Sequence, residues 1–175
     1  MKKVTTTLCL TLAVLLGSMG VSWGADFQKG LTAAQQDDLA TALNLISPHP
    51  NIHPKKVIEI QLRSLQRNNE PIPDAGIKQT WAFAHPDNRL MTGPIERFTL
   101  MMKSQNYKNI LHHRDHKIES VFKTNSRSQF AVSITTLNDQ KMAFNWELMK
   151  VQTGRFSGSW MTTSVSPPLL SGNAF

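Results

Sequence analysis

The densest group of side chains that could bind a metal or transfer protons is His112-His113-Arg114-Asp115-His116. On a helix, His112 and His116 would share one face at the i, i+4 spacing of a zinc-binding pair. The glutamate of a zinc-protease motif is absent, because Asp115 precedes the second histidine of the pair. A helix end or loop, where cationic histidines complement the helix carbonyls, fits the surrounding residues better. The sequence therefore predicts no metal site here, and His113 is kept as a candidate polar-site residue.

Carboxylates supply a second kind of candidate chemistry. Asp74 and Glu96 could act as a general acid or base, provided that they lie within hydrogen-bond reach of a substrate. Each also has a simpler interpretation, since Asp74 is a natural helix N-cap and Glu96 an acidic residue in a first helical turn. The sequence has no glycine-rich phosphate loop and no nucleophile elbow. No set of residues with complete catalytic roles emerges, and no cofactor is predicted.

Aromatic side chains suggest a pocket between helices and strands. Ligand pockets are mostly apolar and carry a few placed polar groups. Arg97 is the predicted polar group, beside Phe98 on the same helix. The same aromatic residues at helical and strand spacing are also typical of an ordinary core. The predicted pocket residues are Trp81, Phe83, Arg97, Phe98, Trp146 and Trp160.

The elements that would position these residues follow from periodicity. Pro54 can open a helix over about 55–68, in which Ile58, Leu62 and Leu65 form one apolar stripe. A second helix is predicted after Asp74, and a third begins at Pro94, with residues 85–93 as a loop between them. After residue 117 the apolar period becomes two, which predicts strands at 117–123, 130–135, 142–148 and 155–165. Helices followed by antiparallel strands indicate an α+β fold of about three helices and about four strands.

The first 24 residues are predicted to be a signal peptide. Two lysines precede an apolar stretch from Leu8 to Val21, and Ser22 and Gly24 stand at the −3 and −1 positions of a cleavage site. The predicted mature chain is periplasmic or secreted, has no transmembrane segment, and lacks cysteine because Cys9 is removed. Residues 25–50 are predicted to form a short helical pair and a proline-containing linker, residues 51–165 a domain, and residues 166–175 a flexible tail.

Composition and charge narrow the class of protein. A chain with 18% charged and 40% hydrophobic residues is not intrinsically disordered. The net charge of +7 is concentrated in residues 88–175, which hold eleven basic and five acidic residues. An anionic component of the cell envelope or an acidic protein would fit such a surface, although scattered lysines and arginines also serve solubility alone. Nucleic acid is not expected, because the predicted export and the lack of a nucleic-acid-binding motif argue against it.

Several short motifs in a fixed order resemble an uncharacterised family, a domain of unknown function found in photosynthetic organisms and bacteria. The resemblance covers residues 55–165 and implies a nuclear-transport-factor-2-like fold, a curved antiparallel sheet wrapped by helices into a cone. The sequence departs from the family where Ser159 and Thr163 replace cysteine and aspartate. Separately, residues 25–46 resemble the start of secreted Sel-type, tetratricopeptide-related repeat proteins. The motifs of the first resemblance are Asp74-x-Gly76-Ile77, Trp81-x-Phe83-Ala84-x-Pro86-x-Asn88, Thr92-Gly93-Pro94, Arg97-Phe98 and Trp160-Met161-Thr162.

Three functions remain open at this point. The leading expectation is a non-catalytic binding or accessory module of the cell envelope, because no catalytic set is complete. The first alternative is a small-molecule hydrolase or isomerase with a carboxylate or histidine in the cone, as the resemblance to the broader superfamily implies. The second alternative is a protein-interaction role for the N-terminal helices. Whether the cone is hollow, and what lines it, decides between the first two.

Overall fold

The computed structural model describes residues 35, 38 and 41–170. The predicted signal peptide lies outside these residues, as does most of the predicted helical pair, of which residues 35, 38, 41 and 42 are described as helical. Four α-helices come first in the part of the chain from residue 50 on: α2 (Pro54–Gln66), α3 (Ala75–Ala82), α4 (Pro86–Thr92) and α5 (Ile95–Met102). A 3₁₀ turn, η2 (Lys108–Ile110), leads into the strands. No helix in this described part is long and apolar enough to cross a membrane.

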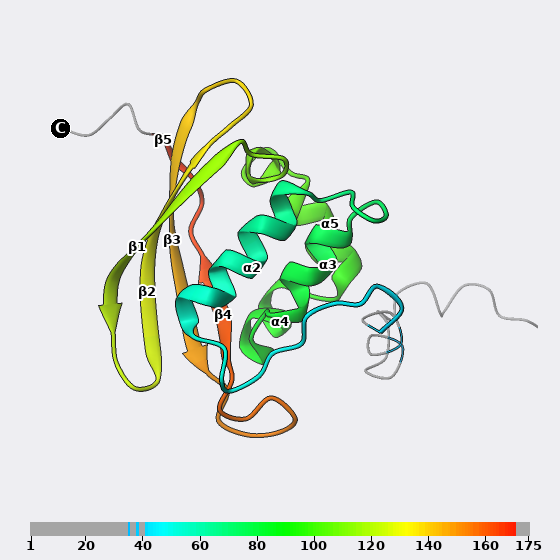
Figure 1. The fold of residues 1–175 in the computed structure, drawn as a ribbon, viewed down its shortest axis with the longest axis vertical. Helices are drawn as coiled ribbons and strands as arrows, with labels where there is room; N and C mark the ends of the chain where they lie inside the picture. Colours follow the sequence, from blue (N-terminus) through cyan, green and yellow to red (C-terminus); the bar gives the residue numbers. More distant parts are fainter. Residues whose placement is uncertain (1–34, 36–37, 39–40, 171–175) are drawn as a thin grey trace, which may run out of the picture.

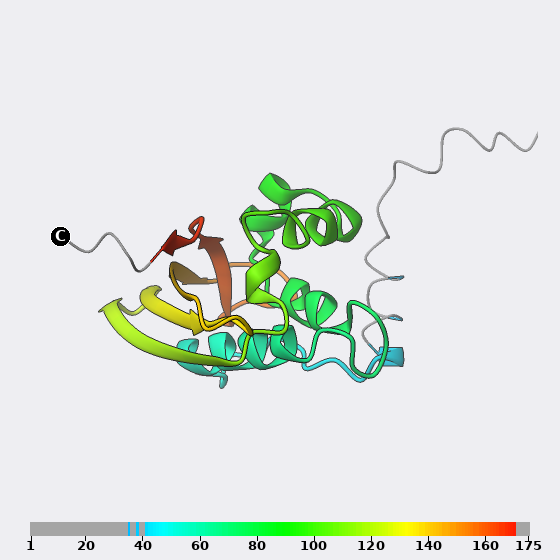
Figure 2. The same cartoon turned by 90° about the horizontal axis from the view of Figure 1, so that it is seen from above.

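The strands form one antiparallel sheet, which makes the fold α+β as predicted. The strands are β1 (Asp115–Lys123), β2 (Arg127–Thr135), β3 (Lys141–Lys150) and β4 (Trp160–Val165), in the order β1-β2-β3-β4. Short β5 (Leu169–Leu170) lies in the predicted tail. It pairs with Met142 and Ala143 of β3, whereas β4 pairs with residues 146–150 of the same strand. The helices gather on one side of the sheet (Figure 1), and the view from above shows α4 and α5 on the far side of the helical layer from α2 (Figure 2).

The core forms where the apolar stripe of α2 meets the inner face of the sheet. Ile58, Leu62 and Leu65 of α2 are fully buried, as the helical spacing predicted. In β2 and β3 every second side chain is buried, which is the pattern of a sheet with one face on the core. The buried members on the strands are Phe130, Val132, Ile134, Met142, Phe144, Trp146 and Leu148.

Helix α4 corrects the prediction of a loop over residues 85–93. The local signals for a helix are present, because Pro86 occupies the first turn and the His85 side chain accepts a hydrogen bond from the Asp87 backbone N–H (3.2 Å). None of its residues is buried. A helix without a buried stripe leaves no apolar periodicity in the sequence, which is why the prediction missed it.

Two further local predictions differ from the structure. Residues 155–159 are not part of the last strand, because Gly154 and Gly158 adopt left-handed backbone angles (φ 83° and 79°) that turn the chain before β4 begins at Trp160. Asp74 occupies the N-cap position of α3 but makes no side-chain cap. Asn68 replaces it, since its Oδ1 accepts the Ile77 N–H (3.0 Å).

The close approach of α2 and α3 depends on Gly76. A Cβ atom at this position would lie 2.1 Å from the carbonyl oxygen of Ser64 and 2.8 Å from the Cα of Asn68, both backbone atoms that cannot move aside cheaply. The sequence therefore brings the two helices nearer to each other than any side chain would permit.

We predict that Gly76→Ala lowers the free energy of unfolding by about 3 kcal/mol, because overpacking against backbone forces α3 away from α2. Urea unfolding followed by tryptophan fluorescence would measure the loss. Gly154→Asn is the matched control, since its position is open and asparagine tolerates the left-handed angle. An equal loss in both variants would contradict the steric explanation.

Candidate functional site

A cavity of about 310 Å³ lies between β4, the middle of β3 and the helices. Its walls are mainly apolar and come from α5, the η2 turn and the two last long strands. Met91 of α4 lines it and is nevertheless 80% exposed, so the mouth of the cavity lies beside α4. A volume of this size is at the lower end of the range for small-molecule sites. The apolar and aromatic lining residues are Ala84, Met91, Phe98, Met101, Met102, Tyr107, Ile110, Trp146 and Val165.

Buried polar side chains from three elements meet at the inner wall of the cavity. Trp146 Nε1 donates to Gln61 Oε1 and to Thr162 Oγ1, both at 3.2 Å. Thr162 Oγ1 donates to Gln61 Oε1 at 2.8 Å. Gln61, Trp146 and Thr162 are 1%, 2% and 3% exposed, so these bonds form away from water. We call these three residues the polar floor.

Backbone pairing holds the polar floor in position. Thr162 N donates to Phe83 O, and His85 N donates to Thr162 O, both at 2.8 Å, so the segment after α3 forms a short parallel bridge with β4. Gln61 Nε2 donates to the carbonyl of Thr80 in α3 (3.1 Å). The floor therefore ties α2 and α3 to the strands, and its side chains have little freedom to rotate.

The described residues that line the cavity include no aspartate, glutamate, histidine, lysine or arginine. Tyr107 is the one titratable group among them; burial raises its pKa, so its hydroxyl stays neutral at physiological pH. That hydroxyl donates to Val165 O (3.2 Å). The described walls carry hydroxyl and amide groups but no carboxylate, imidazole or charged group, so they offer a bound molecule apolar contacts and neutral hydrogen bonds.

The predicted aromatic residues divide into two sets. Phe98 and Trp146 line the cavity. Trp81, Phe83 and Trp160 are buried in the core beyond it, with Trp81 packed on Phe98 at 4.9 Å between ring centroids. The predicted polar group, Arg97, is exposed and does not line the cavity; its side chain lies over Gly93.

The predicted polar-site residues lie apart from one another and outside the cavity. Glu96 is exposed in the first turn of α5. Asp74 pairs with Lys103, whose Nζ donates to Oδ2 at 2.6 Å. Partial burial tends to raise the pKa of the Asp74 carboxyl, but hydrogen bonds from Lys103 and Asn68 outweigh that effect and leave the pKa below its ordinary value. This carboxylate has the role of a surface ion pair between α3 and the end of α5.

His113 is 1% exposed and forms a pair with His116 at the start of β1. Its Nδ1 lies 2.7 Å from the Ile110 carbonyl oxygen, which only accepts, so Nδ1 carries a proton. Its Nε2 lies 2.8 Å from His116 Nδ1, a distance at which one proton is shared. Burial lowers the pKa of both rings. Among the residues that the structure describes, no group of three or more metal-ligating side chains includes this pair.

The sequence predicted Trp146 as a pocket residue but not Gln61 and Thr162, the other two residues of the floor, although one signal was available. Gln61 stands three residues after Ile58 and therefore on the same buried stripe of α2. A polar side chain at such a position must find a hydrogen-bond partner inside the protein. Its partner Thr162 is 101 residues away, and nothing in the local sequence marks that contact.

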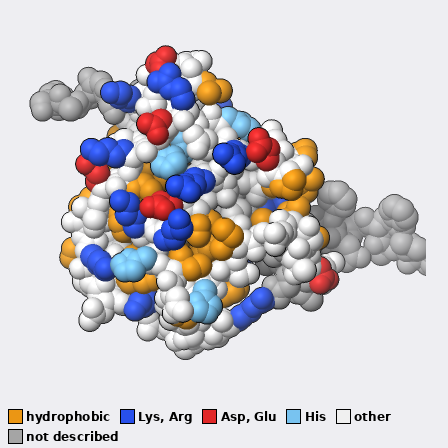
Figure 3. Space-filling view, viewed as in Figure 1, with side chains coloured by type: hydrophobic (Ala, Val, Ile, Leu, Met, Phe, Trp, Pro, Cys, Tyr) orange, Lys and Arg blue, Asp and Glu red, His pale blue; other side chains and the backbone are white. Residues whose placement is uncertain are grey.

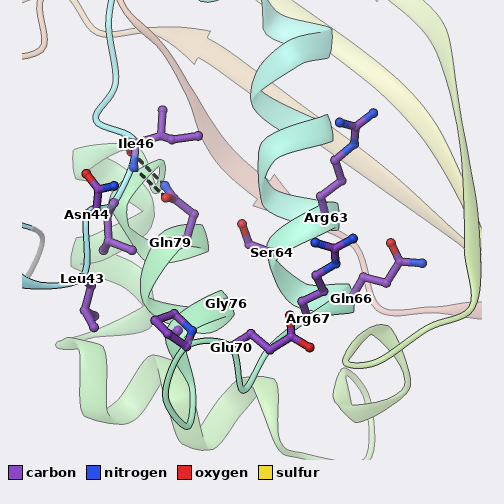
Figure 4. A pocket seen from close by; sticks show the side chains of 13 residues that line it. Leu43, Asn44, Ile46, Arg63, Ser64, Gln66, Arg67, Glu70, Gly76 and Gln79 are labelled. Carbon is purple, nitrogen blue, oxygen red and sulfur yellow. Dashed lines mark hydrogen bonds between the residues drawn. The ribbon is translucent and has the colours of Figure 1, made fainter.

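A second hollow, of about 620 Å³, lies between residues 43–46 and the facing sides of α2 and α3 (Figure 4). Gln79 anchors the segment, because its amide donates to Ile46 O and accepts from Ile46 N, both at 2.8 Å. Arg67 and Glu70 on its rim are exposed to solvent. Among the described residues that line this hollow, no charged side chain is buried, and we assign it no ligand.

The surface charge is mixed where it can be seen. On the face in Figure 3, lysine and arginine side chains alternate with aspartate, glutamate and histidine, with apolar patches between them. Ion pairs such as Arg127 with Glu147 (2.7 Å), on the neighbouring strands β2 and β3, join opposite charges at the surface. This face therefore offers no continuous basic surface of the kind that nucleic acids require.

Comparison with known proteins adds no assignment, since no family model, no curated protein and no solved structure matches the chain. The resemblances described from the sequence therefore stay predictions.

We predict that the His113–His116 pair makes the protein less stable in mild acid. Its pKa values lie below the unfolded value of about 6.5, so the unfolded chain binds protons there that the native state does not. The stability that the neutral histidine pair contributes is fully present above about pH 6.5. It is lost as the pH falls toward the lowered pKa values of the pair. Urea unfolding at pH 7.5 and 5.5 would measure it.

The double variant His113→Gln, His116→Gln should show a smaller pH dependence than the natural sequence over this interval. His112→Gln, at an exposed neighbouring position, is the control and should keep the full dependence. An unchanged slope in the double variant would show that other groups cause it, of which His85, whose pKa burial also lowers, is the first to examine.

Proposed function

We propose that this protein is a non-catalytic binding module of the cell envelope, periplasmic or secreted, which holds a small, mainly apolar molecule between its sheet and helices. The observation that carries the proposal is the cavity of about 310 Å³ with mainly apolar walls and the polar floor at one end. Sites for small molecules have this composition, with apolar contacts for affinity and a few polar groups for orientation. The proposal includes the cone of a nuclear-transport-factor-2-like fold as the scaffold.

The position of the cavity supports binding over catalysis. A hydrolase or isomerase of the kind expected from the resemblance needs a carboxylate or histidine that faces its substrate. Asp74 and Glu96 lie outside the cavity, and His113 is turned toward His116 and Ile110. The lining side chains can instead exclude water and surround a ligand, for which burial contributes about 25 cal/mol per Å² of apolar surface.

The test fills the cavity from within. Ala84 lines it and is 2% exposed, so Ala84→Leu places three more carbon atoms in the binding space. We expect the natural protein to bind the fluorescent hydrocarbon amine 1-aminoanthracene, and Ala84→Leu to weaken this binding at least ~10-fold, equivalent to about 1.4 kcal/mol. Fluorescence titration measures both affinities.

Ala131→Leu is the matched control, because Ala131 is half-buried in β2 and does not line the cavity. It should bind the probe as the natural protein does. Thermal unfolding of both variants separates lost binding from lost folding. If the natural protein does not bind the probe, or if the two variants lose binding equally, the cavity is not a ligand site.

A further inference from the structure

The cavity and its polar floor also indicate the chemical class of the ligand. We propose that the site selects a neutral amphiphile, an uncharged molecule with an apolar body and one hydroxyl or carbonyl group, and that this group is bound at Gln61 and Thr162. The inference rests on the proposed function and goes further, because it names the charge state of the ligand and the polar group that the floor binds.

A neutral ligand is expected because the described lining of the cavity carries no charged side chain. A carboxylate or ammonium group inside would leave water without meeting a side chain of opposite charge, because the described lining residues carry none. Burying an unpaired ion costs several kcal/mol even after relaxation, more than the apolar part of a ligand of this size can readily offset. Charged side chains are abundant elsewhere on the surface, so their lack on this wall distinguishes the cavity from its surroundings.

The remaining hydrogen-bonding capacity of the floor selects a polar group. Gln61 Nε2 has two N–H donors, and within the described part of the chain one of them is used, by Thr80 O. Thr162 Oγ1 donates to Gln61 and accepts from Trp146, which leaves it one further lone pair. A hydroxyl can accept from the amide and donate to the threonine, whereas a carbonyl can only accept from the amide. A pure hydrocarbon would leave the second amide N–H of Gln61 and the remaining lone pair of Thr162 unused.

The position of the mouth determines which end enters first. The floor is at most 3% exposed, whereas Met91 at the mouth is 80% exposed. A ligand whose polar group reaches Gln61 must therefore extend its apolar body along Phe98 and Met102 toward Met91 and Met101. Methionine side chains adapt to apolar surfaces of different shape, so the outer part of the site can accept bodies of varied form.

Displacement of bound 1-aminoanthracene at pH 7.5 tests the ligand class. Decan-1-ol, decanoate and decylammonium share one chain length and differ in the charge of the head group. We expect decan-1-ol to displace the probe at a concentration at least ~30-fold lower than either ion requires, about 2 kcal/mol of discrimination, within the range for a buried uncompensated polar group. If decanoate or decylammonium competes as well as the alcohol, the neutral class is wrong, although the cavity would still be a ligand site.

Thr162→Val tests the placement of the head group. Removal of the hydroxyl should weaken decan-1-ol by about 3- to 10-fold, the worth of one hydrogen bond, and leave the affinity for the probe within 2-fold. Thr92→Val is the matched control, since its hydroxyl also borders the cavity but is bonded to Asn88 O (2.8 Å) within α4. Thr162→Ser keeps the hydroxyl and should keep the affinity for the alcohol.

The other possible results show whether the ligand class and head-group placement fail or the proposed function itself fails. Equal loss in Thr162→Val and Thr92→Val, or no loss in either, would overturn the placement of the head group at the floor. Probe binding without displacement by the alcohol would overturn the ligand class and leave the proposed function standing. Absence of probe binding in the natural protein contradicts the proposed function itself, as described above. If Thr162→Val unfolds, Gln61→Met removes the amide donor of the floor instead. It should weaken decan-1-ol by about 3- to 10-fold relative to Thr92→Val, and an unchanged affinity would overturn the placement.

Discussion

The hydrogen bonds among Gln61, Trp146 and Thr162 connect parts of the chain that apolar packing alone would leave free to slide. Gln61 comes from α2, Trp146 from β3 and Thr162 from β4, and the glutamine amide continues the connection to the backbone of α3. Apolar contacts are non-directional, so they stabilise the layers without fixing their register. Buried hydrogen bonds require defined positions, because an unmade bond costs more than a made one contributes. The position of the helices on the sheet, and hence the space that remains as the cavity, depends on these side chains.

Charged side chains lie at the surface of the protein, whereas the described wall of the cavity carries none. The chain carries a net charge of +7, and charged residues are found at the surface in ion pairs such as Lys103 with Asp74. Such exposed pairs contribute little to stability. The histidine pair is the main exception, since His113 is buried and is kept neutral by its surroundings. Ionisation can therefore alter stability at the η2 turn, while the cavity wall keeps one charge state across the physiological pH range.

The fold class could be predicted from the sequence because its signals are local. The stripe of Ile58, Leu62 and Leu65 and the alternation along β2 and β3 each repeat within one element. Helix α4 gives no such signal, since none of its side chains is buried. Phe156 and Trp160 have the spacing of a strand, which is why the last strand was predicted to begin at residue 155. In the structure a turn that contains Gly154 and Gly158 precedes Trp160. Local patterns thus report burial, and they fail where an element is exposed or where backbone geometry interrupts it.

The candidate site could be predicted only in part, for a different reason. The sequence indicates that aromatic residues meet between helices and sheet, and Phe98 and Trp146 do line the cavity. Which aromatic residues face a space and which face the core depends on how α4, α5 and β4 approach one another, and these contacts are far apart in sequence. Trp81 is one position from a cavity-lining threonine and yet packs against Phe98 without lining the cavity. Only the three-dimensional structure distinguishes the aromatic residues that face the cavity from those that face the core.

The way in which α4 is attached has a consequence for the rate at which a ligand would enter and leave the cavity. This helix is joined to the body through polar contacts, with Asn88 Nδ2 bonded to Thr162 O (3.1 Å) and Arg89 Nη2 bonded to the carbonyls of Trp81 and Ala82 (3.0 and 3.1 Å). None of its own side chains is buried, so local opening of this helix costs less than global unfolding. The exchange rate of a ligand would then depend on how often this short helix opens. Its affinity would depend on the lining side chains, most of which come from outside α4. Substitutions at the polar contacts of α4 would therefore change the exchange rate more than the affinity.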